Sequence, residues 1–270
     1  MLVKSIGTAR RVVNSLAKMA RGPKGAAPRV ADVANAARSL GFLAGRKLGA
    51  GQSTTLHLGF AGQTHAFSIK DRNDLSVLED VFLEDEYAVD VATPDVIFDL
   101  GANFGAASIS FAHKWPGAQI FSVEPNPEMF QRLTENAKPY GAITCLNVAV
   151  GAADGEADFH VTPDHVGSSF YRDGSDARSI KVQVRSLRSL MEQFNLKHVD
   201  VLKFDVEGAE ELLFQDPQTL HAVGAAVGEV HPDLMAVSSD DFVSKFADFD
   251  VATAPLFGSR FLLRAMRAAA

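Results

Sequence analysis

The stretch of sequence that decides the fold runs from residue 96 to residue 105 and reads Val96-Ile97-Phe98-Asp99-Leu100-Gly101-Ala102-Asn103-Phe104-Gly105. An apolar run leads into a turn bounded by glycines, and a helical pattern follows at 106–114. Such a strand–turn–helix unit directs backbone N–H groups and a helix N-terminus at a ligand. The segment therefore predicts the first unit of an α/β fold with a ligand site at its turn.

Short apolar runs of the same kind recur along the chain, with helical stretches between several of them. Strands are expected at 96–100, 119–123, 144–148, 199–204 and 225–230, and helices at 106–114, 127–136 and 186–194. This alternation predicts parallel strands joined by crossovers, hence an α/β fold with a doubly wound, mostly parallel sheet. Two added strands are expected at 157–161 and 180–184, and a C-terminal antiparallel hairpin at 248–252 and 259–263, which such sheets tolerate.

The charge of the 270-residue chain is divided unevenly, although the total is only −7. Residues 1–50 carry ten basic side chains and one acid, and the remainder is strongly acidic. We therefore expect three regions: a basic, helical N-terminal extension at 1–50, a hairpin and acidic helix leading into the core at 51–92, and a core domain at 93–270. Within the second region, 55–58 and 66–69 are the hairpin strands and 75–88 the helix.

The basic extension has two interpretations. Residues 1–20 place apolar side chains at helical spacing among Lys and Arg, a pattern typical of a helix on an anionic membrane surface or an acidic partner. A helix docked on the chain's own acidic domain, or a loosely ordered tail, gives the same pattern. No uncharged apolar run reaches the roughly 18 residues of a spanning helix. The expected location is the cytoplasm, with peripheral membrane attachment as the alternative.

Composition excludes several other classes. Cys145 is the single cysteine, so an intramolecular disulfide framework and a cysteine-cluster zinc site are both ruled out. The acidic total argues against specific or general nucleic-acid binding by the whole chain. A small-molecule or glycan partner is expected instead.

The turn at 101–105 departs from the pattern of a dinucleotide enzyme. In that pattern a middle glycine lets the backbone approach a pyrophosphate. Here Asn103 occupies the middle position, and Asp99 adds negative charge just before the turn. Both features disfavour a pyrophosphate and favour a ligand with an amino group.

An acid ends the second expected strand. Glu124 follows 119–123, where a carboxylate can accept hydrogen bonds from both hydroxyls of a ribose. The alternative is a carboxylate favoured by the dipole of the helix beginning at Pro127.

More acids follow the later strands. Asp205 and Glu207 come after 199–204, and Glu229 and His231 come at the end of 225–230. Ligands of open α/β sheets bind beyond the carboxyl ends of the strands. These groups are candidates for proton acceptors, substrate anchors or ligands of a divalent cation, although no metal ligand is assigned. A structural alternative pairs Lys203 with Glu210 and lets His231 merely end its strand.

Taken in order, these segments resemble the FkbM family of S-adenosylmethionine-dependent methyltransferases. The matching pieces are 99–105, Glu124-Pro125-Asn126-Pro127, Asn147-Val148-Ala149-Val150-Gly151, Gly167-Ser168-Ser169 and 202–210. The resemblance spans about residues 80–232 and implies a Rossmann-like methyltransferase fold. It also implies an enzyme that uses S-adenosylmethionine to methylate a hydroxyl, commonly on a sugar or secondary metabolite.

The resemblance further implies a role for individual residues. Asp99, Gly101 and Gly105 would hold the methionine part of the cofactor, with Ala102 and Asn103 of the same loop also counted as cofactor-binding. Glu124 would hold the ribose, Asn147 and Val148 would lie near the adenine, and Asp205 would sit next to the methyl group.

An alcohol is a poor nucleophile, so a base within hydrogen-bond reach is expected. Asp205 is the first candidate, followed by Glu207 and His231. Two other functions stay open: a nicotinamide-dependent oxidoreductase on a related fold, and a non-catalytic nucleoside-binding module tethered by its basic N-terminus. The acceptor and the oligomeric state are not specified by any pattern in the sequence.

Overall fold

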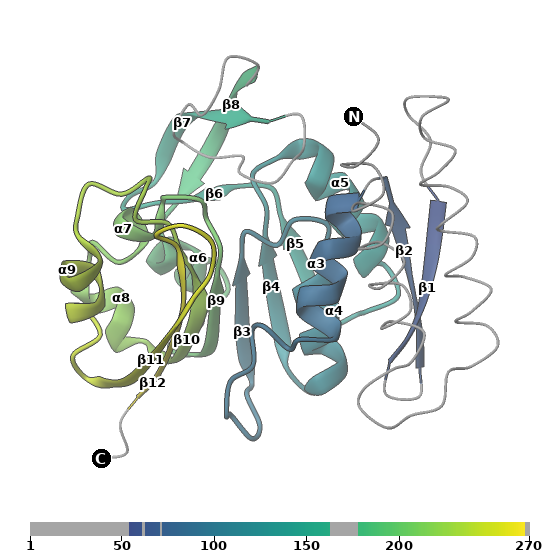
Figure 1. Cartoon of the computed structure of the whole chain (residues 1–270), viewed down its shortest axis with the longest axis horizontal. Coiled ribbons are helices and arrows are strands. Elements are labelled where there is room, and N and C mark those ends of the chain that lie inside the picture. The colour runs from purple at the N-terminus through teal and green to yellow at the C-terminus, as the bar shows by residue number, and fades with distance from the viewer. Residues whose placement is uncertain (1–53, 61–62, 71, 163–177, 268–270) are drawn as a thin grey trace. The chain divides into compact units, whose positions relative to one another are not determined.

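The computed structural model describes residues 54–60, 63–70, 72–162 and 178–267 (Figure 1). The chain divides into two compact units between Glu86 and Tyr87. The predicted basic extension at 1–50 and the segment 167–169 lie outside the described residues. No helix of the described part is both long enough and apolar enough to cross a membrane.

The first unit contains the predicted hairpin. β1 (Thr54–Phe60) pairs antiparallel with β2 (Gln63–Ile69), and Leu56 lies opposite Phe67. Alternate residues of both strands are buried because successive side chains of a strand point to opposite faces.

A helix follows the hairpin but with different bounds from those predicted. α3 spans Arg72–Phe82 instead of 75–88. It starts early because the carboxylate of Asp74 accepts the Lys70 N–H at 2.5 Å, which satisfies a donor just before the helix. It ends early because the chain turns at Asp85, whose φ of 51° is left-handed and does not continue an α-helix.

The second unit is built on a seven-stranded sheet with the order β11-β12-β10-β9-β3-β4-β5. Its strands are β3 (Val96–Leu100), β4 (Gln119–Val123), β5 (Ile143–Leu146), β9 (Val199–Phe204), β10 (Val223–Val230), β11 (Phe249–Pro255) and β12 (Phe261–Arg267). The first five are mutually parallel, while β12 runs antiparallel to both β10 and β11. The predicted doubly wound sheet and its C-terminal hairpin are confirmed.

The strand order reverses between β3 and β9. From β3 the chain builds outward through β4 to β5, and it then returns to β9 and builds the other way through β10. Such a reversal leaves a crevice at the carboxyl ends of the two central strands, where open α/β sheets bind their ligands. The residues after Leu100 and Phe204 therefore occupy the expected ligand position.

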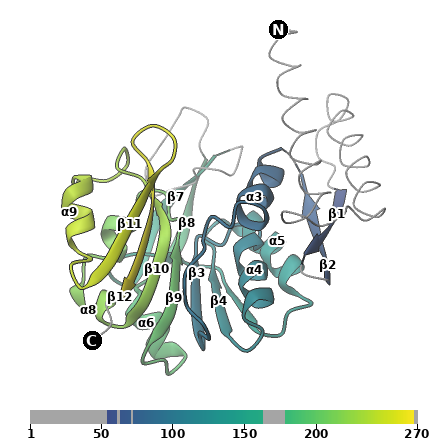
Figure 2. The same ribbon diagram turned by 60° about the horizontal axis from the view of Figure 1, so that its bottom comes forward.

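Helices cover both faces of this sheet. They are α4 (Ala106–Lys114), α5 (Pro127–Ala137), α6 (Leu187–Gln193), α7 (Glu210–Leu213), α8 (Pro217–His221) and α9 (Ser239–Ser244). Figures 1 and 2 show α4 and α5 on one side of the sheet and α6, α8 and α9 on the other. On the second side, buried apolar residues of α6, α8 and α9 pack with Phe98, Phe121 and Phe204 into the main core.

One strand ends earlier than predicted. The run 144–148 was expected to be a single strand, but β5 stops at Leu146 and the chain turns at Asn147. Residues Ala149–Val150 then form β6 of a separate three-stranded sheet with β7 (Gly155–Val161) and β8 (Arg178–Arg185). The turn occurs because the Asn147 side-chain amide donates to the backbone oxygen of Glu124 at 2.8 Å instead of continuing the ladder.

Candidate active site

The loop after β3 is held in a tight, left-handed conformation. Gly101, Asn103 and Gly105 have φ angles of 76°, 51° and 95°. Position 101 requires glycine for two reasons. Its φ is positive, and a Cβ there would lie 1.8 Å from the backbone oxygen of Asp205. Asn is one of the few other residues that adopt this region readily, which accounts for Asn103. The loop is thus pressed directly against the end of β9.

Glu124 is bound into this loop from the neighbouring strand. One carboxylate oxygen accepts the Asn103 N–H at 2.8 Å, and the other accepts the Asn126 N–H at 2.8 Å. The side chain is only 6% exposed. Burial raises the pKa of Glu124, and the two hydrogen bonds from backbone N–H groups lower it. Burial is the larger effect, so the pKa rises from 4.5 to about 7. Asn126 in turn accepts the Glu128 N–H, so the side-chain cap of α5 is Asn126 and not Glu124.

Asp99 is buried beneath the loop, and its expected contact with the amino group of a ligand stays a prediction. Its side chain is fully buried, 3.0 Å from the ammonium of Lys203, and accepts a hydrogen bond from the Ser108 hydroxyl at 2.5 Å. Asp99 lies opposite Lys203 across β3 and β9, so both point to the α4 side of the sheet. Its carboxylate is therefore a support beneath the loop.

Lys203 has a different partner from the one expected. The sequence suggested Glu210, yet Lys203 pairs with Asp99 and also donates to the Gly101 backbone oxygen at 2.8 Å. Burial disfavours its ammonium form, but the carboxylates of Asp99 and Asp205 outweigh burial and hold the pKa of Lys203 above its ordinary value. The buried ion pair between Lys203 and Asp99 thus holds the loop at 101–105 in place through the backbone of Gly101.

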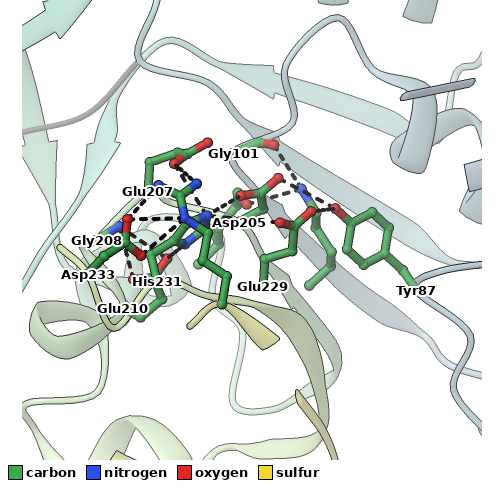
Figure 3. A network of polar contacts seen from close by, with 12 residues as sticks. Tyr87, Gly101, Asp205, Glu207, Gly208, Glu210, Glu229, His231 and Asp233 are labelled. Carbon is green, nitrogen blue, oxygen red and sulfur yellow. Dashed lines mark hydrogen bonds and ion pairs between the residues drawn. The ribbon is translucent and has the colours of Figure 1, made fainter. Parts of the chain in front are cut away.

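His231 is the true partner of Glu210 and lies among acids from two strand ends. Its Nδ1 is 2.8 Å from Glu210, and its Nε2 is 3.3 Å from Glu207 and 3.9 Å from Asp205 (Figure 3). Glu229 is also 3.9 Å from the same nitrogen. The predicted candidates Asp205, Glu207 and His231 are therefore brought together at the carboxyl ends of β9 and β10.

The protonation states of this cluster are shifted. Burial disfavours the imidazolium of His231, but the hydrogen bond and charge of Glu210, together with the other acids, raise its pKa to about 9. Burial and the Asp205 carboxylate raise the pKa of Glu207 to about 7. At neutral pH His231 is a proton donor in this structure, so a carboxylate is the better proton acceptor.

Two residues join the cluster without any signal in the sequence. The Tyr87 hydroxyl lies 3.3 Å from Glu229 and 3.5 Å from Asp205, and the Lys203 ammonium lies 5.0 Å from its ring. Arg260 pairs with Asp233 at 2.9 Å and reaches Glu207 at 3.4 Å. Tyr87 precedes β3 and Arg260 lies between β11 and β12, so only the folded sheet brings them here.

The predicted adenine residues lie beside the Glu124 turn. Asn147 donates to the backbone oxygens of Glu124 and Pro125 at 2.8 and 3.2 Å, which leaves its side chain at the end of β4. Val148 is half-buried. A role of either residue in binding adenine stays a prediction.

A mostly parallel sheet with one antiparallel strand, β12, and with a glycine-bounded loop and a buried acid at its carboxyl edge is the arrangement expected of a Rossmann-like methyltransferase. The family model described as the Methyltransferase FkbM domain matches residues 99–248, which is more than half of the chain. The chain therefore belongs to the FkbM methyltransferase family, as the sequence motifs indicated.

Two curated proteins are similar to part of this chain. A hexuronic acid methyltransferase, AglP, from Haloferax volcanii is 30% identical over 139 residues, which cover 51% of this chain and 56% of that protein. A 2-O-methyltransferase, NoeI, from Sinorhizobium fredii is 31% identical over 134 residues, covering 43% of this chain and 55% of the relative. The chain thus spans about half the length of each of these two relatives.

Among solved structures, an FkbM methyltransferase from Methylobacillus flagellatus aligns with a TM-score of 0.44 and 14% identity. The alignment covers 64% of this chain and 43% of that one.

Proposed function

We propose that this chain transfers the methyl group of S-adenosylmethionine to a hydroxyl of a sugar, glycan or secondary metabolite. One observation carries the proposal: the left-handed loop at 101–105, bound to Glu124, is pressed against Asp205 at the point where the strand order reverses. The names of the two relatives, a hexuronic acid methyltransferase and a 2-O-methyltransferase, support a sugar hydroxyl as the acceptor.

The residues of the loop fit the methionine part of this cofactor. The side-chain oxygen of Asn103 is buried and has no hydrogen-bond partner among the described residues. A buried acceptor of this kind is costly unless a donor reaches it. The ammonium of the cofactor supplies such a donor. In this proposal Asn103 takes the role that the sequence first gave to Asp99, and Asp99 acts through Lys203.

Glu124 fits the ribose. Two backbone N–H groups fix its carboxylate, and each oxygen retains lone pairs for a further hydrogen bond. Charge-assisted bonds of this type contribute about 1.5–3 kcal/mol each. Glu124 must be ionised to accept from both ribose hydroxyls, so its raised pKa makes binding sensitive to pH near 7.

When bound, the cofactor would supply a methyl group on a positively charged sulfur. The acceptor oxygen attacks the methyl carbon in line with the sulfur, which is the leaving group. The chain's own task is to align the acceptor oxygen and to take its proton. One Asp205 oxygen is buried and has no hydrogen-bond partner in the described part of the chain, so it is positioned to accept the hydroxyl proton. The His231 ring lies 3.3 Å from Glu207 and 3.9 Å from Asp205 and limits the positions that these carboxylates can take.

A nicotinamide-dependent oxidoreductase is the second candidate, because a ribose-binding acid serves that function equally well. Asn103 disfavours it, since a side chain stands where a pyrophosphate would approach the backbone. A third candidate is a non-catalytic nucleoside-binding module. In this candidate the basic segment 1–20 attaches the module to a membrane or an acidic partner. Liposome binding that is lost on deletion of residues 1–45, with methyl transfer retained, would make that segment a tether of an active enzyme.

The test of methyl transfer uses methyl-labelled S-adenosylmethionine and a panel of hexoses, hexuronic acids and glycans that contain them. We expect label in at least one acidic or neutral sugar, with a mass increase of one CH2. Uptake of label should stop when the reacting hydroxyl is already methylated. Label in none of the acceptors, together with reduction of NAD in their presence, would establish the oxidoreductase instead.

A further inference from the structure

His231 stands at the centre of a set of carboxylates. Its side chain is 1% exposed, and its Nε2 faces Glu207 at 3.3 Å and both Asp205 and Glu229 at 3.9 Å (Figure 3). The acids come from the ends of two neighbouring strands, β9 and β10, so the arrangement is a product of the fold and not of one loop.

The orientation of the His231 ring is fixed through its Nδ1 atom, on the side away from the Nε2 atom. The His231 Nδ1 is 2.8 Å from the fully buried carboxylate of Glu210, which also accepts the Gly208 N–H at 3.0 Å. A histidine that ligates a metal characteristically donates its other ring N–H to a carboxylate, which sets the tautomer and aims the second nitrogen. Glu210 holds His231 in this way, with Nε2 turned toward the acids.

Two buried polar atoms face one another across this cluster without a hydrogen-bond partner among the described residues. They are the Nε2 of His231 and the Oδ1 of Asp205. Buried polar atoms without a partner call for a ligand or an ordered water. Here the atoms are an imidazole nitrogen and a carboxylate oxygen, which are metal ligands.

The charge of the cluster also favours a cation. The two nearest bases have acids of their own, since Lys203 pairs with Asp99 and Arg260 pairs with Asp233. Arg260 offsets part of the Glu207 charge at 3.4 Å. Asp205, Glu207, Glu210 and Glu229 nevertheless surround a single imidazole.

We propose that Asp205, Glu207 and His231 bind one divalent transition-metal cation. One ligand atom from each lies within 4.8 Å of the others. Neighbouring ligands around a metal, at bond lengths of about 2.0–2.2 Å, are separated by about 3 Å, close to the 3.3 Å between His231 and Glu207. One imidazole with two carboxylates suits Mn²⁺, Fe²⁺ or Zn²⁺ better than Mg²⁺ or Ca²⁺.

The role of the cation in methyl transfer rests on the proposed function. The binding of the cation does not. A divalent cation acidifies a hydroxyl that coordinates it. The hydroxyl proton passes to Asp205, as in the proposed function, the O–CH3 bond forms, and the S–CH3 bond breaks with its electron pair remaining on sulfur. A sugar hydroxyl next to a second oxygen would coordinate such a cation through both atoms.

Binding is tested with Mn²⁺ alone, without substrate or cofactor. The full-length chain is stripped with a chelator, Mn²⁺ is titrated in, and unbound Mn²⁺ is counted by electron paramagnetic resonance. We expect one tight site per chain. His231→Gln and Asp205→Asn should each abolish it, and Glu210→Gln, which removes only the positioning residue, should weaken it about 10–100-fold. Asp158→Asn, at an exposed carboxylate on β7, is the matched control and should bind as the wild type does.

Melting curves without metal establish that each variant is folded before its affinity is compared. No Mn²⁺ binding by the folded wild type, or equal binding by the wild type, Asp205→Asn and Glu210→Gln, overturns the site. Methyl transfer that continues in excess chelator also overturns the metal's role while leaving the proposed function intact. Tight Mn²⁺ binding that is lost in the variants, with no methyl transfer to any acceptor, upholds the site and counts against the proposed function.

Discussion

The ammonium of Lys203 lies 3.0 Å from the carboxylate of Asp99, directly opposite it on the neighbouring parallel strand. Both side chains are buried, and Lys203 also donates to the backbone oxygen of Gly101. The pair therefore joins the two central strands beneath the loop on which the proposed cofactor site depends. It is part of the loop's support.

Removing one partner of this pair should destabilise the protein strongly. Lys203→Met leaves a buried carboxylate without its cation, and such changes cost about 3–5 kcal/mol. We expect this decrease in the free energy of unfolding, measured by urea denaturation at pH 7. Lys181→Met, at an exposed ion pair with Asp158, is the control and should change stability by less than about 1 kcal/mol. Equal effects of the two substitutions would show that the buried pair does not hold the sheet together.

The loop itself should not tolerate a side chain at Gly101. Gly101→Ala places a Cβ 1.8 Å from the Asp205 backbone oxygen in a left-handed conformation, so the loop and the end of β9 must separate. We expect weaker binding of S-adenosylhomocysteine and a lower melting temperature. Gly117→Ala is the matched control, because a Cβ there meets nothing within 4 Å. An unchanged affinity of Gly101→Ala for S-adenosylhomocysteine would show that the loop does not form part of the proposed cofactor site.

Glu124 should make stability depend on pH. Burial raises its pKa from 4.5 in the unfolded chain to about 7, so the folded state holds the proton more tightly. Its contribution is fully present below pH 4.5 and is lost as the pH rises through about 7. Relative to Glu124→Gln, the free energy of unfolding of the wild type should fall by about 3 kcal/mol over that interval. Parallel pH profiles for the two proteins would contradict the assignment.

Asp205 should matter for turnover more than for cofactor binding. Loss of a positioned proton acceptor lowers rates by about 10²–10⁴-fold. We expect Asp205→Asn to lower kcat within this range while the affinity for S-adenosylhomocysteine changes by less than about threefold. Initial rates with labelled cofactor and calorimetry on the same preparation measure the two effects. A variant with wild-type turnover would remove Asp205 from the mechanism.

Much of the fold follows from local pattern. The helix predicted at 106–114 is α4 with the same bounds, and the strands at 96–100, 119–123 and 199–204 are β3, β4 and β9. These elements are set by apolar periodicity and by glycine at the turn, which act over a few residues. The early end of β5 escaped prediction because it depends on a long-range hydrogen bond from Asn147 to Glu124.

The candidate site was predictable only in part, for a similar reason. Asp205, Glu207 and His231 could be found because each lies within three residues of the end of a strand whose carboxyl end must face the crevice. The inward turn of Asp99 depends on the register that sets it opposite Lys203, and register is a property of two strands together. Tyr87 and Arg260 lie on connecting segments, and only the assembled sheet places them beside the acids.

The most direct test of the central claim is calorimetric titration of S-adenosylhomocysteine, and separately of NAD, into the full-length chain at pH 8. The account predicts one molecule of S-adenosylhomocysteine per chain, no measurable binding of NAD, and affinity at least about tenfold lower in Glu124→Ala, as the loss of one charge-assisted hydrogen bond requires. Binding of NAD, no binding of S-adenosylhomocysteine, or an unchanged affinity in Glu124→Ala would contradict it.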